Sequence, residues 1–555
     1  MPFGIKSRDR ERHMYVIGKT GMGKSTLLEN MAIQDIRNGE GFAYIDPHGS
    51  SVDKLLDYIP ADRVKDVVYF APFDMENPIA FNVMEDVGYD KRHLVVSGLM
   101  ATFKKIWVDA WSARMEYILS NTLLALLEYP GATLMGVNRM YTDKAYRKLV
   151  VDNVKDPLVK DFWTKEFAQY TDRFTQEATP AIQNKVGLFT SNPLIRNIIG
   201  QSKSTFDIRE LMDQKKILLI NLSKGLVGDT NMKLLGSMIT TRIFLAAMSR
   251  ADLSAADIGK LPKFYFYVDE FQNFANETFA EILSEARKYK LNLLIAHQYV
   301  EQMEEEVRAA VFGNVGTTIA FRVGPFDAEV LETVFSPEFM KEDLVNLGFV
   351  QIYLTLMIDG IGSRPFSAVT IPPIEPPPQS YRSQVIEMSR KQFAVPRVEI
   401  EDKIIADLAP STPPPSAGAT EAKPVRKYEG ERRPPAARAP ERPREPRKET
   451  PPRMERTPEP KAKSAEDLKA ILRTMTEGAQ KEKKKGEKQQ QSSVRVALKE
   501  VVQKSDKEKP REEKPRQQNN PPREPRREQP PQTPSGPRPF EVPEDTLRSI
   551  FKDNV

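Results

Sequence analysis

Two patterns of hydrophobic and polar positions alternate through the first 370 residues of the chain. Short runs of β-branched and aromatic residues, most of them apolar at every position, are separated by longer segments with helical spacing. Continuous apolar runs are typical of parallel strands buried on both faces, so the alternation predicts an α/β layered domain with a mainly parallel sheet. The expected strands are Met14–Ile17, Phe42–Ile45, Val67–Phe70, Ile217–Asn221, Phe264–Val268, Leu291–Ala296 and Thr317–Phe321.

One long interval lacks strand patterns. Between about Lys91 and Leu211 the apolar positions recur at helical spacing, and Pro130 with Gly131 ends the clearest of these helices. Its stripe consists of Met115, Ile118, Leu119, Leu123 and Leu126. We therefore expect an all-helical insertion domain at 91–211, between the two parts of the sheet domain at 1–90 and 212–371.

The composition changes abruptly after Ile371. The following residues are rich in Pro, Arg, Lys, Glu and Gln, and they contain too little apolar surface to form a core. We expect a long disordered C-terminal tail at 372–555, with short helical segments near 464–476, 493–503 and 543–552 that can dock on partner proteins. The net charge of +5 hides a split, because an acidic folded part is joined to this basic, proline-rich tail.

Several classes of function are excluded by composition. The chain has no cysteine, and its four histidines lie at no metal-ligand spacing, so disulfides, zinc ribbons, iron–sulfur clusters and thiol nucleophiles are ruled out. The first eleven residues are charged and do not resemble a signal peptide, and no segment approaches the roughly 20 apolar residues of a membrane span. We expect a cytoplasmic protein, with any membrane association supplied by a partner.

A phosphate-binding motif follows the first expected strand. Its residues match G-x-x-x-x-G-K-[ST] and precede a helical pattern, which is the context that this motif requires. They are Gly18, Lys19, Thr20, Gly21, Met22, Gly23, Lys24 and Ser25, followed by Thr26. Glycines let the backbone approach the phosphates, and the amides at the helix N-terminus point at the same anion. Lys24 would reach the β- and γ-phosphates, Ser25 would bind Mg²⁺ and Thr26 would lie near the α-phosphate, so the motif predicts ATP and Mg²⁺ as ligands.

An acidic pair ends a later strand. Asp269 and Glu270 directly follow the apolar run Phe264–Val268. Asp269 would complete the Mg²⁺ shell, and Glu270 would accept a proton from the attacking water. A solvated acidic turn is the ordinary interpretation of such a pair alone; beside a phosphate-binding loop, the catalytic interpretation is favoured.

Two further residues, a glutamine and an arginine, complete the predicted catalytic set. The strand Leu291–Ala296 ends in His297 and Gln298, and we favour Gln298 as the group that orients the water or senses the γ-phosphate. Hydrolysis also needs positive charge at the transferred phosphoryl group, often from a neighbouring subunit's arginine. Arg287 is the first candidate and Arg322 the second, and a solvated surface arginine is the alternative for each.

Taken together, these motifs resemble a known family. The stretches Arg12–Gly21, Tyr44–Gly49 and Asn77–Asn82 are similar to the type IV secretion coupling-protein family, the TraD/TraG-like ATPases within the FtsK–HerA superfamily of P-loop ATPases. The resemblance covers about residues 5 to 370, including the helical insertion. It continues through Phe266–Phe271, Arg287, Gln298, Gly313–Thr317 and Phe321–Arg322.

The resemblance implies an assembly and a task. It implies a RecA-like core in a homo-hexameric ring, ATP bound between neighbours, DNA passing through or across the ring, and a secretion channel as partner. It also implies that Arg287 acts in trans and that Asp46–Gly49 belongs to the rim of the site. Coupling proteins usually carry N-terminal transmembrane helices, and only 17 residues precede Gly18. We therefore expect another chain to supply the anchor, or the ATPase to work unanchored.

The functional prediction is an ATP-hydrolysing DNA translocase subunit of the coupling-protein kind. Lys104–Lys105, Ser223–Gly225 and basic clusters of the tail are candidates for phosphate contacts, with ordinary surface lysines as the alternative. Two other functions stay open: a secretion or pilus-assembly ATPase that acts on protein, and a nucleotide-controlled adaptor. The intact Glu270 argues against the adaptor, and DNA-stimulated hydrolysis would separate the first two.

Overall fold

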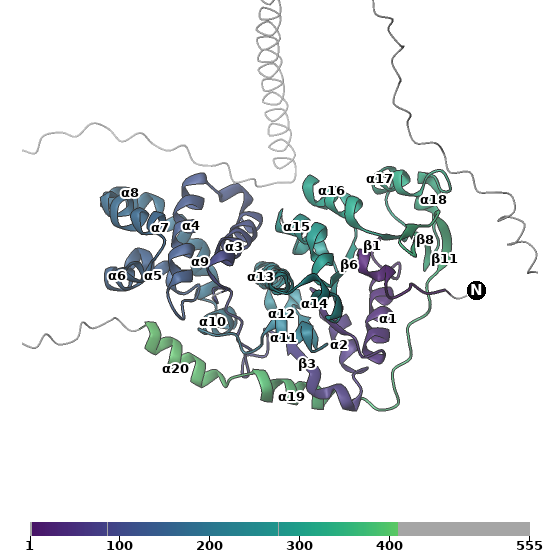
Figure 1. Ribbon diagram of the computed structural model, residues 1–555, viewed down its shortest axis with the longest axis horizontal. Helices are drawn as coiled ribbons and strands as arrows, with labels where there is room; N and C mark the ends of the chain where they lie inside the picture. Colours follow the sequence, from purple (N-terminus) through teal and green to yellow (C-terminus); the bar gives the residue numbers. More distant parts are fainter. Residues whose placement is uncertain (1–2, 86, 276, 409–555) are drawn as a thin grey trace, which may run out of the picture. The chain divides into compact units, whose positions relative to one another are not determined.

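A computed structural model describes residues 3–85, 87–275 and 277–408 (Figure 1). Nine strands form one sheet in the order β11-β8-β7-β1-β6-β5-β2-β4-β3. All neighbours from β7 to β3 are parallel, whereas β8 and β11 are added antiparallel at one edge. The strands are β1 (Met14–Ile17), β2 (Gly41–Asp46), β3 (Val67–Phe70), β4 (Ile217–Asn221), β5 (Phe264–Val268), β6 (Leu291–His297), β7 (Thr317–Ala320), β8 (Gln351–Thr355) and β11 (Phe366–Val369). The predicted α/β class with a mainly parallel sheet is confirmed.

The strands that the sequence missed are those at the antiparallel edge. All seven expected strands are present, with ends that differ by no more than one residue. The missed ones are β8, β11 and the small pair β9 (Met357–Ile358) and β10 (Ile361–Gly362). Exposure alternates along β8 and β11 because this edge is only partly covered, so these strands lack the continuous apolar runs of the buried ones.

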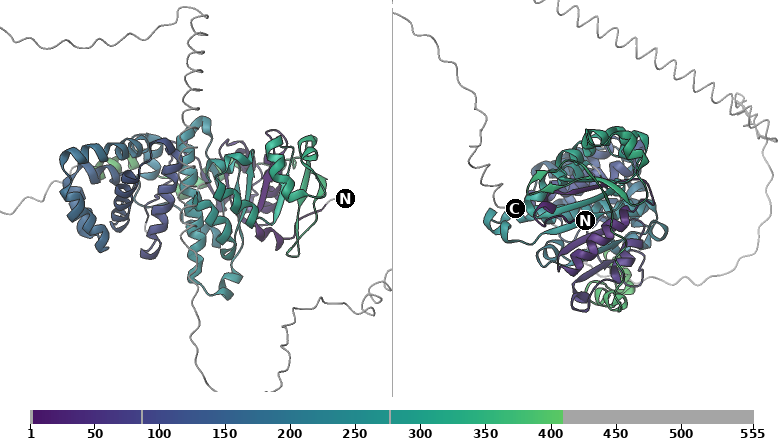
Figure 2. Two further views of the ribbon diagram at one scale, coloured as in Figure 1. Left: turned by 90° about the horizontal axis from the view of Figure 1, so that it is seen from above. Right: turned by 90° about the vertical axis from the view of Figure 1, so that its right-hand side faces the viewer.

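Two layers of helices cover the sheet, and alternate residues of each strand serve one layer or the other. Met14 and Val16 of β1 belong to the apolar cluster under α1 (Lys24–Arg37) and α2 (Ser50–Leu56). Tyr15 and Ile17 belong to the cluster under α13 (Asp229–Met248) and α15 (Glu277–Glu285). Figure 2 shows the strands running between these helices. The remaining helices of this domain are α12 (Lys224–Val227), α14 (Ala255–Lys260), α16 (Glu305–Asn314), α17 (Pro325–Phe335) and α18 (Lys341–Asn346).

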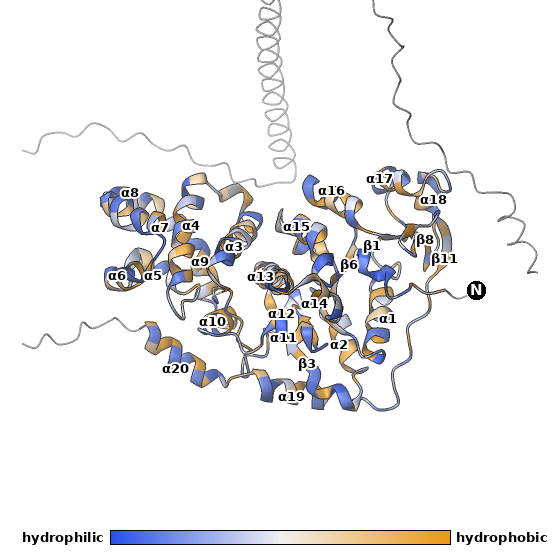
Figure 3. Ribbon diagram, viewed as in Figure 1, coloured by the Kyte–Doolittle hydropathy of each residue, from blue (hydrophilic) through white to orange (hydrophobic). Residues whose placement is uncertain are grey.

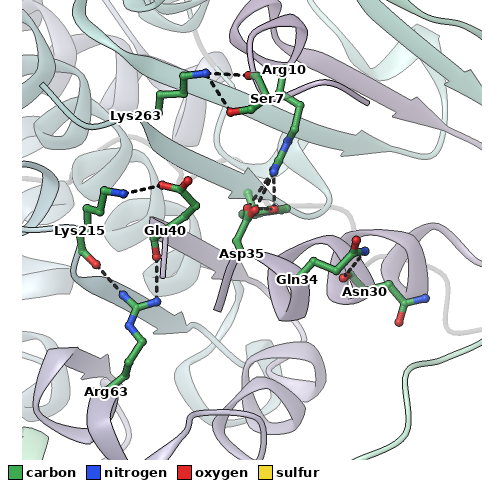
Figure 4. A network of polar contacts seen from close by, with 10 residues as sticks. Ser7, Arg10, Asn30, Gln34, Asp35, Glu40, Arg63, Lys215 and Lys263 are labelled. Carbon is green, nitrogen blue, oxygen red and sulfur yellow. Dashed lines mark hydrogen bonds and ion pairs between the residues drawn. The ribbon is translucent and has the colours of Figure 1, made fainter. Parts of the chain in front are cut away.

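A buried ion pair ties α1, the helix after the phosphate-binding loop, to the N-terminal segment. The guanidinium of Arg10 donates to both carboxylate oxygens of Asp35 at 2.6 and 2.9 Å (Figure 4). It also stacks 3.9 Å from the centre of the Tyr265 ring. Asp35 is fully buried, so removing Arg10 would leave an uncompensated charge in the core. Arg63 makes a second link, to the backbone carbonyls of Glu40 and Lys215.

The described residues between β3 and β4 contain helices and no strand, which confirms the all-helical insertion. All five residues of the predicted apolar stripe are buried in α4, which ends at Glu128 before Pro130. The first helix, α3, packs along α13, and one continuous apolar cluster joins the insertion to the sheet domain. The helices are α3 (Arg92–Ile106), α4 (Ala113–Glu128), α5 (Gly136–Thr142), α6 (Lys144–Asn153), α7 (Pro157–Asp161), α8 (Asp172–Ala178), α9 (Pro180–Thr190), α10 (Pro193–Ile199) and α11 (Ile208–Asp213).

The folded part extends to Leu408, beyond the predicted boundary at Ile371. Helix α19 (Arg382–Phe393) packs on β3, and α20 (Arg397–Leu408) packs on α10 of the insertion. Apolar and polar residues are mixed along both helices (Figure 3), and Val385, Ile400 and Ile404 are buried. Polar contacts such as Arg390 with Asp74 add to this packing. The prolines at 372–378 therefore lie in a connection within the fold and do not end it.

Two further predictions concern the helical segments of the tail and the absence of membrane-spanning helices. The helical segments expected near 464–476, 493–503 and 543–552 lie outside the described residues. Among residues 3–408, apart from the two undescribed positions, no helix combines the length and the apolar character that crossing a bilayer requires.

Candidate functional site

The phosphate-binding loop lies across the carboxyl ends of three neighbouring strands. It leaves β1 at Gly18, whose amide donates to the carbonyl of His297 at 3.3 Å, and the Lys19 amide donates to the carbonyl of Arg322 at 2.8 Å. A Cβ atom at Gly18 would lie 2.5 Å from the Cβ of Phe321, so only glycine allows this approach. Gly23, with φ of 114°, turns the chain into α1 in a conformation that side chains rarely adopt.

The Lys24 side chain turns back into this loop. It is 5% exposed, and its ammonium donates to the carbonyls of Gly18 at 2.6 Å and Lys19 at 3.3 Å. Burial lowers the pKa of Lys24, and the carboxylates of Glu270 and Asp269 oppose that shift. The ammonium therefore lies on the inner side of the loop, where a P-loop protein holds the β- and γ-phosphates.

Ser25 and Asp269, predicted as the magnesium ligands, are in contact. The hydroxyl of Ser25 donates to a carboxylate oxygen of Asp269 at 2.9 Å. Burial raises the pKa of Asp269 to about 6, with further contributions from Asp46 and Glu270, so a cation beside this carboxylate would be stabilised. Hard oxygen donors of this kind fit Mg²⁺, which usually takes one or two protein groups together with phosphate oxygens and water. The described residues contain no cluster of three or more His, Asp or Glu side chains able to hold a metal alone.

Glu270 is held at the tip of β5 by two glutamines. Its backbone is left-handed, with φ of 48°. Residues other than glycine rarely adopt this conformation, and it often marks functional sites. Gln272 donates to one carboxylate oxygen at 2.6 Å, and the amide of Gln298 donates to the other. The carboxylate is 7% exposed, so these contacts fix its position within a largely buried environment.

Gln298 joins the acidic pair to the phosphate-binding loop. Its side-chain oxygen accepts a hydrogen bond from the Thr20 hydroxyl at 3.0 Å, while its nitrogen binds Glu270. His297, the alternative at the same strand end, is fully buried, lies 3.3 Å from the Tyr15 hydroxyl and packs on Phe271. Burial lowers the pKa of His297 to about 3, so the ring is neutral at physiological pH. The geometry therefore favours Gln298 as the polar group at this tip.

The two candidate arginines lie at opposite ends of the parallel strands. Arg322 follows β7, and its carbonyl binds the phosphate-binding loop of its own chain. Arg287 is exposed and precedes β6, whereas Gln298 follows β6. Seven residues of strand at about 3.3 Å each separate them by roughly 20 Å. Arg287 therefore lies too far from the nucleotide site of its own chain to contact a phosphate there.

The turn Asp46–Gly49 lies at the carboxyl end of β2, next to β5. Asp46 accepts hydrogen bonds from the amides of His48 at 2.7 Å and Ser51 at 2.8 Å, and Gly49 has φ of 87°. A Cβ atom at Gly49 would lie 2.5 Å from the side chain of Asn221, so the turn has no space for a larger residue. Its rigid carboxylate lies close enough to raise the pKa of Asp269.

Two of the lysines predicted as DNA contacts have partners within the chain, and the basic clusters of the tail lie outside the described residues. Lys224 forms an ion pair with Asp229 at 2.7 Å and is still more than half exposed. Lys105 is partly buried and donates to the backbone carbonyl of Gln272 at 2.7 Å. Sequence reasoning missed both Gln272 and this role of Lys105. The only sequence signal for Gln272 was its place two residues after Glu270, and Lys105 had none.

The fold and the site define a P-loop NTPase of the RecA-like kind, with the loop at β1 and the acidic pair at β5, separated from it in the sheet by β6 alone. A family model described as the type IV secretion-system coupling protein DNA-binding domain matches residues 2–333. This match covers more than half of the chain, so the chain belongs to that family.

Similarities to solved structures were also found. The bacterial conjugative coupling protein TrwBdeltaN70, in an unbound monoclinic form, is 14% identical and has a TM-score of 0.48, with 66% of this chain and 86% of that one covered. The plasmid coupling protein TrwB in complex with ADP and Mg²⁺ is 15% identical with a TM-score of 0.47, covering 67% and 89%. VirB4 of Thermoanaerobacter pseudethanolicus is 14% identical with a TM-score of 0.40, covering 67% and 91%. No curated protein matches the chain.

Proposed function

We propose that the chain is an ATP-hydrolysing DNA translocase subunit that delivers DNA to or through a secretion-type apparatus. The observation that carries this proposal is the continuous contact from Thr20 of the phosphate-binding loop through Gln298 to Glu270. An adaptor that only binds nucleotide has no need of a general base fixed beside its phosphate-binding loop. The family to which the chain belongs is described by its DNA-binding domain, which favours DNA over protein as the substrate.

The proposed chemistry is attack of water on the γ-phosphorus of ATP. Glu270 accepts the proton of the water as its oxygen bonds to phosphorus, and the bond from phosphorus to the β,γ-bridging oxygen breaks. Lys24 neutralises charge on the phosphate oxygens, and Gln298 orients the water. The products are ADP and inorganic phosphate.

Ser25 and Asp269 are the residues that would hold a magnesium ion. When bound, the ion supplies charge neutralisation at the β- and γ-phosphates. The burial of Asp269 supports this assignment, because an ionised carboxylate in such surroundings requires a nearby cation.

The position of Arg287 supports an assembly of identical subunits. Within one chain it lies at the far edge of the sheet from the site, so it can complete a site only in another subunit. We place it as an arginine that acts in trans in a homo-hexamer, with Arg322 as the candidate within the same chain. An anchoring partner would bring the ring to a membrane.

The test is the ATPase rate of the purified chain with double-stranded DNA, single-stranded DNA and no nucleic acid, each at two salt concentrations. We expect stimulation by at least one form of DNA, and weaker stimulation at the higher salt because phosphate contacts are screened. Hydrolysis that no DNA changes would favour the protein-secretion alternative. An absence of hydrolysis under every condition would refute the proposed chemistry.

A further inference from the structure

A lysine of the helical insertion holds the backbone of the loop that carries Glu270. Lys105, in the last turn of α3, donates to the backbone carbonyl of Gln272 at 2.7 Å and also to that of Ala275. These carbonyls belong to the short turn Phe271–Asn273 and the residues just after it. Free carbonyls at the end of a helical turn carry partial negative charge, so a cation is favoured there.

The loop in turn holds the carboxylate. The side-chain nitrogen of Gln272 donates to Glu270 at 2.6 Å, and the amide and side chain of Asn273 both donate to the carbonyl of Glu270 at 3.0 Å. Gln272 thus links the two residues: its backbone carbonyl binds Lys105, and its side-chain amide binds Glu270. Displacing this backbone would therefore move the proposed general base.

The other anchor of the loop lies on the sheet domain. Phe274 packs so closely on Gly236 of α13 that a Cβ atom there would lie 2.1 Å from its ring. That contact fixes the apolar side of the loop, whereas Lys105 fixes its polar side from the insertion. The loop after Glu270 is thus anchored on the sheet domain through Phe274 and on the insertion through Lys105, while Gln298 holds the Glu270 carboxylate directly.

The ammonium of Lys105 also borders a polar cavity. The cavity has a volume of about 320 Å³ and is lined by Asp229, Lys233, Asn273 and Gln302 as well. Burial lowers the pKa of Lys105 to about 8, while the charge of Glu304 favours the protonated form. An ammonium beside a polar cavity can exchange its carbonyl partners for water, unlike one sealed in an apolar core.

From these contacts, we propose that Lys105 is a positioning residue for ATP hydrolysis, which makes the orientation of Glu270 depend on the docking of the helical insertion. The inference rests on the proposed function and deepens it, since it assigns the insertion control over turnover. Lys105 touches no reacting atom and acts through Gln272.

The experiment compares Lys105→Met with Lys105→Arg in the full chain. Lys148→Met serves as the matched control, because Lys148 is an exposed lysine of the same insertion. Loss of one charged hydrogen bond that positions the base should lower kcat about tenfold, with KM and the dissociation constant for ATP within about twofold of wild type. Lys105→Arg should restore most of kcat. Unchanged kcat in Lys105→Met, or an equal loss in Lys148→Met, would overturn the proposal.

Two further readouts separate positioning from simple destabilisation. Gln272→Leu combined with Lys105→Met should lose no more kcat than the more severe single variant, because both changes break one path. Additive losses would contradict that path. Hydrogen exchange at the amides of Asn273, Phe274 and Ala275 should become faster in Lys105→Met. Unchanged exchange would overturn the proposal even if the wild-type chain failed to hydrolyse ATP, so the two failures are distinguishable.

Discussion

The carboxyl ends and the amino ends of the parallel strands carry different parts of the proposed site. They are called here the carboxyl edge and the amino edge of the sheet. At the carboxyl edge, Asp269, Glu270 and Gln298 are linked by hydrogen bonds to one another and to the phosphate-binding loop. The Lys24 ammonium turns into the same loop. At the amino edge, Arg287 is exposed and lies roughly one strand length from that set, at about 3.3 Å per residue. The carboxyl edge therefore holds most of the residues proposed for hydrolysis, and the arginine at the amino edge cannot contact a phosphate bound there in its own chain.

With Arg287 acting in trans, as proposed, the site would be divided between the two ends of a subunit. Parallel strands place all their carboxyl ends together, so a residue before a strand cannot join a residue after it. A ring in which the amino edge of one subunit faces the carboxyl edge of the next would resolve the division. The predictions below test that interpretation.

The largest effect is expected at the amino edge. Arg287→Ala should lower ATP turnover by about 10³-fold, as loss of an arginine acting in trans does in other NTPases, while ATP binding is retained. Mixing Arg287→Ala with Lys24→Ala subunits should recover part of the activity, since mixed interfaces contain one intact site. Arg37→Ala is the control, because Arg37 is an exposed arginine at the far end of α1. If no mixing ratio recovered activity, the amino edge of one subunit would not meet the carboxyl edge of the next.

The next effect is expected at the carboxyl edge. Glu270→Gln keeps the shape of the side chain and one of its two accepted hydrogen bonds but removes the base, so kcat should fall about 10²- to 10³-fold with ATP affinity little changed. Stopped-flow binding and steady-state hydrolysis of the same preparation provide the two numbers. Wild-type turnover in this variant would remove Glu270 from its role and leave the carboxyl edge without a general base.

A third prediction concerns a segment that belongs to neither edge. Deleting residues 376–555 removes α19 and α20, with the buried Val385, Ile400 and Ile404, and should lower the free energy of unfolding by about 3 kcal/mol or more. Deleting only 409–555 should leave it unchanged. Urea denaturation of both truncations gives the comparison. Equal stability would show that the two helices add nothing to the fold, and the predicted boundary at Ile371 would then be adequate.

The smallest effect concerns a buried histidine at the amino edge. Burial lowers the pKa of His13 to about 4, and its ring accepts a hydrogen bond from the Leu293 amide at 3.0 Å. Because the unfolded chain binds this proton more readily, stability should fall as pH drops from about 6.5 to about 4, by at most about 3 kcal/mol. His13→Asn, which keeps a short polar side chain but has no proton to bind in this range, should reduce that slope. Identical slopes in urea midpoints would exclude His13 as the cause.

The sequence predicted the parts of the site that depend on local chemistry. The phosphate-binding loop and the pair Asp269–Glu270 each follow an apolar strand, so their position at one edge followed from the parallel sheet alone. The contact of Gln298 with Thr20 joins residues far apart in the chain, and only the fold shows it. Lys105 was predicted as a candidate for phosphate contacts, with an ordinary surface lysine as the alternative, because nothing local indicates that α3 ends against the loop after Glu270.

Elements outside the buried sheet were harder to predict. Strands β8 and β11 lie at a partly exposed edge and lack the continuous apolar runs of the central strands. Helices α19 and α20 bury only a few apolar residues, such as Val385, Ile400 and Ile404, and they add polar contacts with residues far away in the chain. Tertiary contact, rather than local propensity, decides whether such segments fold.

The central claim is that Lys24 holds the phosphates of Mg-ATP at the carboxyl edge of the sheet. An equilibrium titration of wild-type and Lys24→Ala protein with ATP, with and without Mg²⁺, tests it most directly. We predict saturable binding by the wild type that Mg²⁺ strengthens, and a loss of about 100-fold or more in affinity for the variant, as expected for removal of a buried cation beside phosphate. Equal affinity of the two proteins would contradict the account.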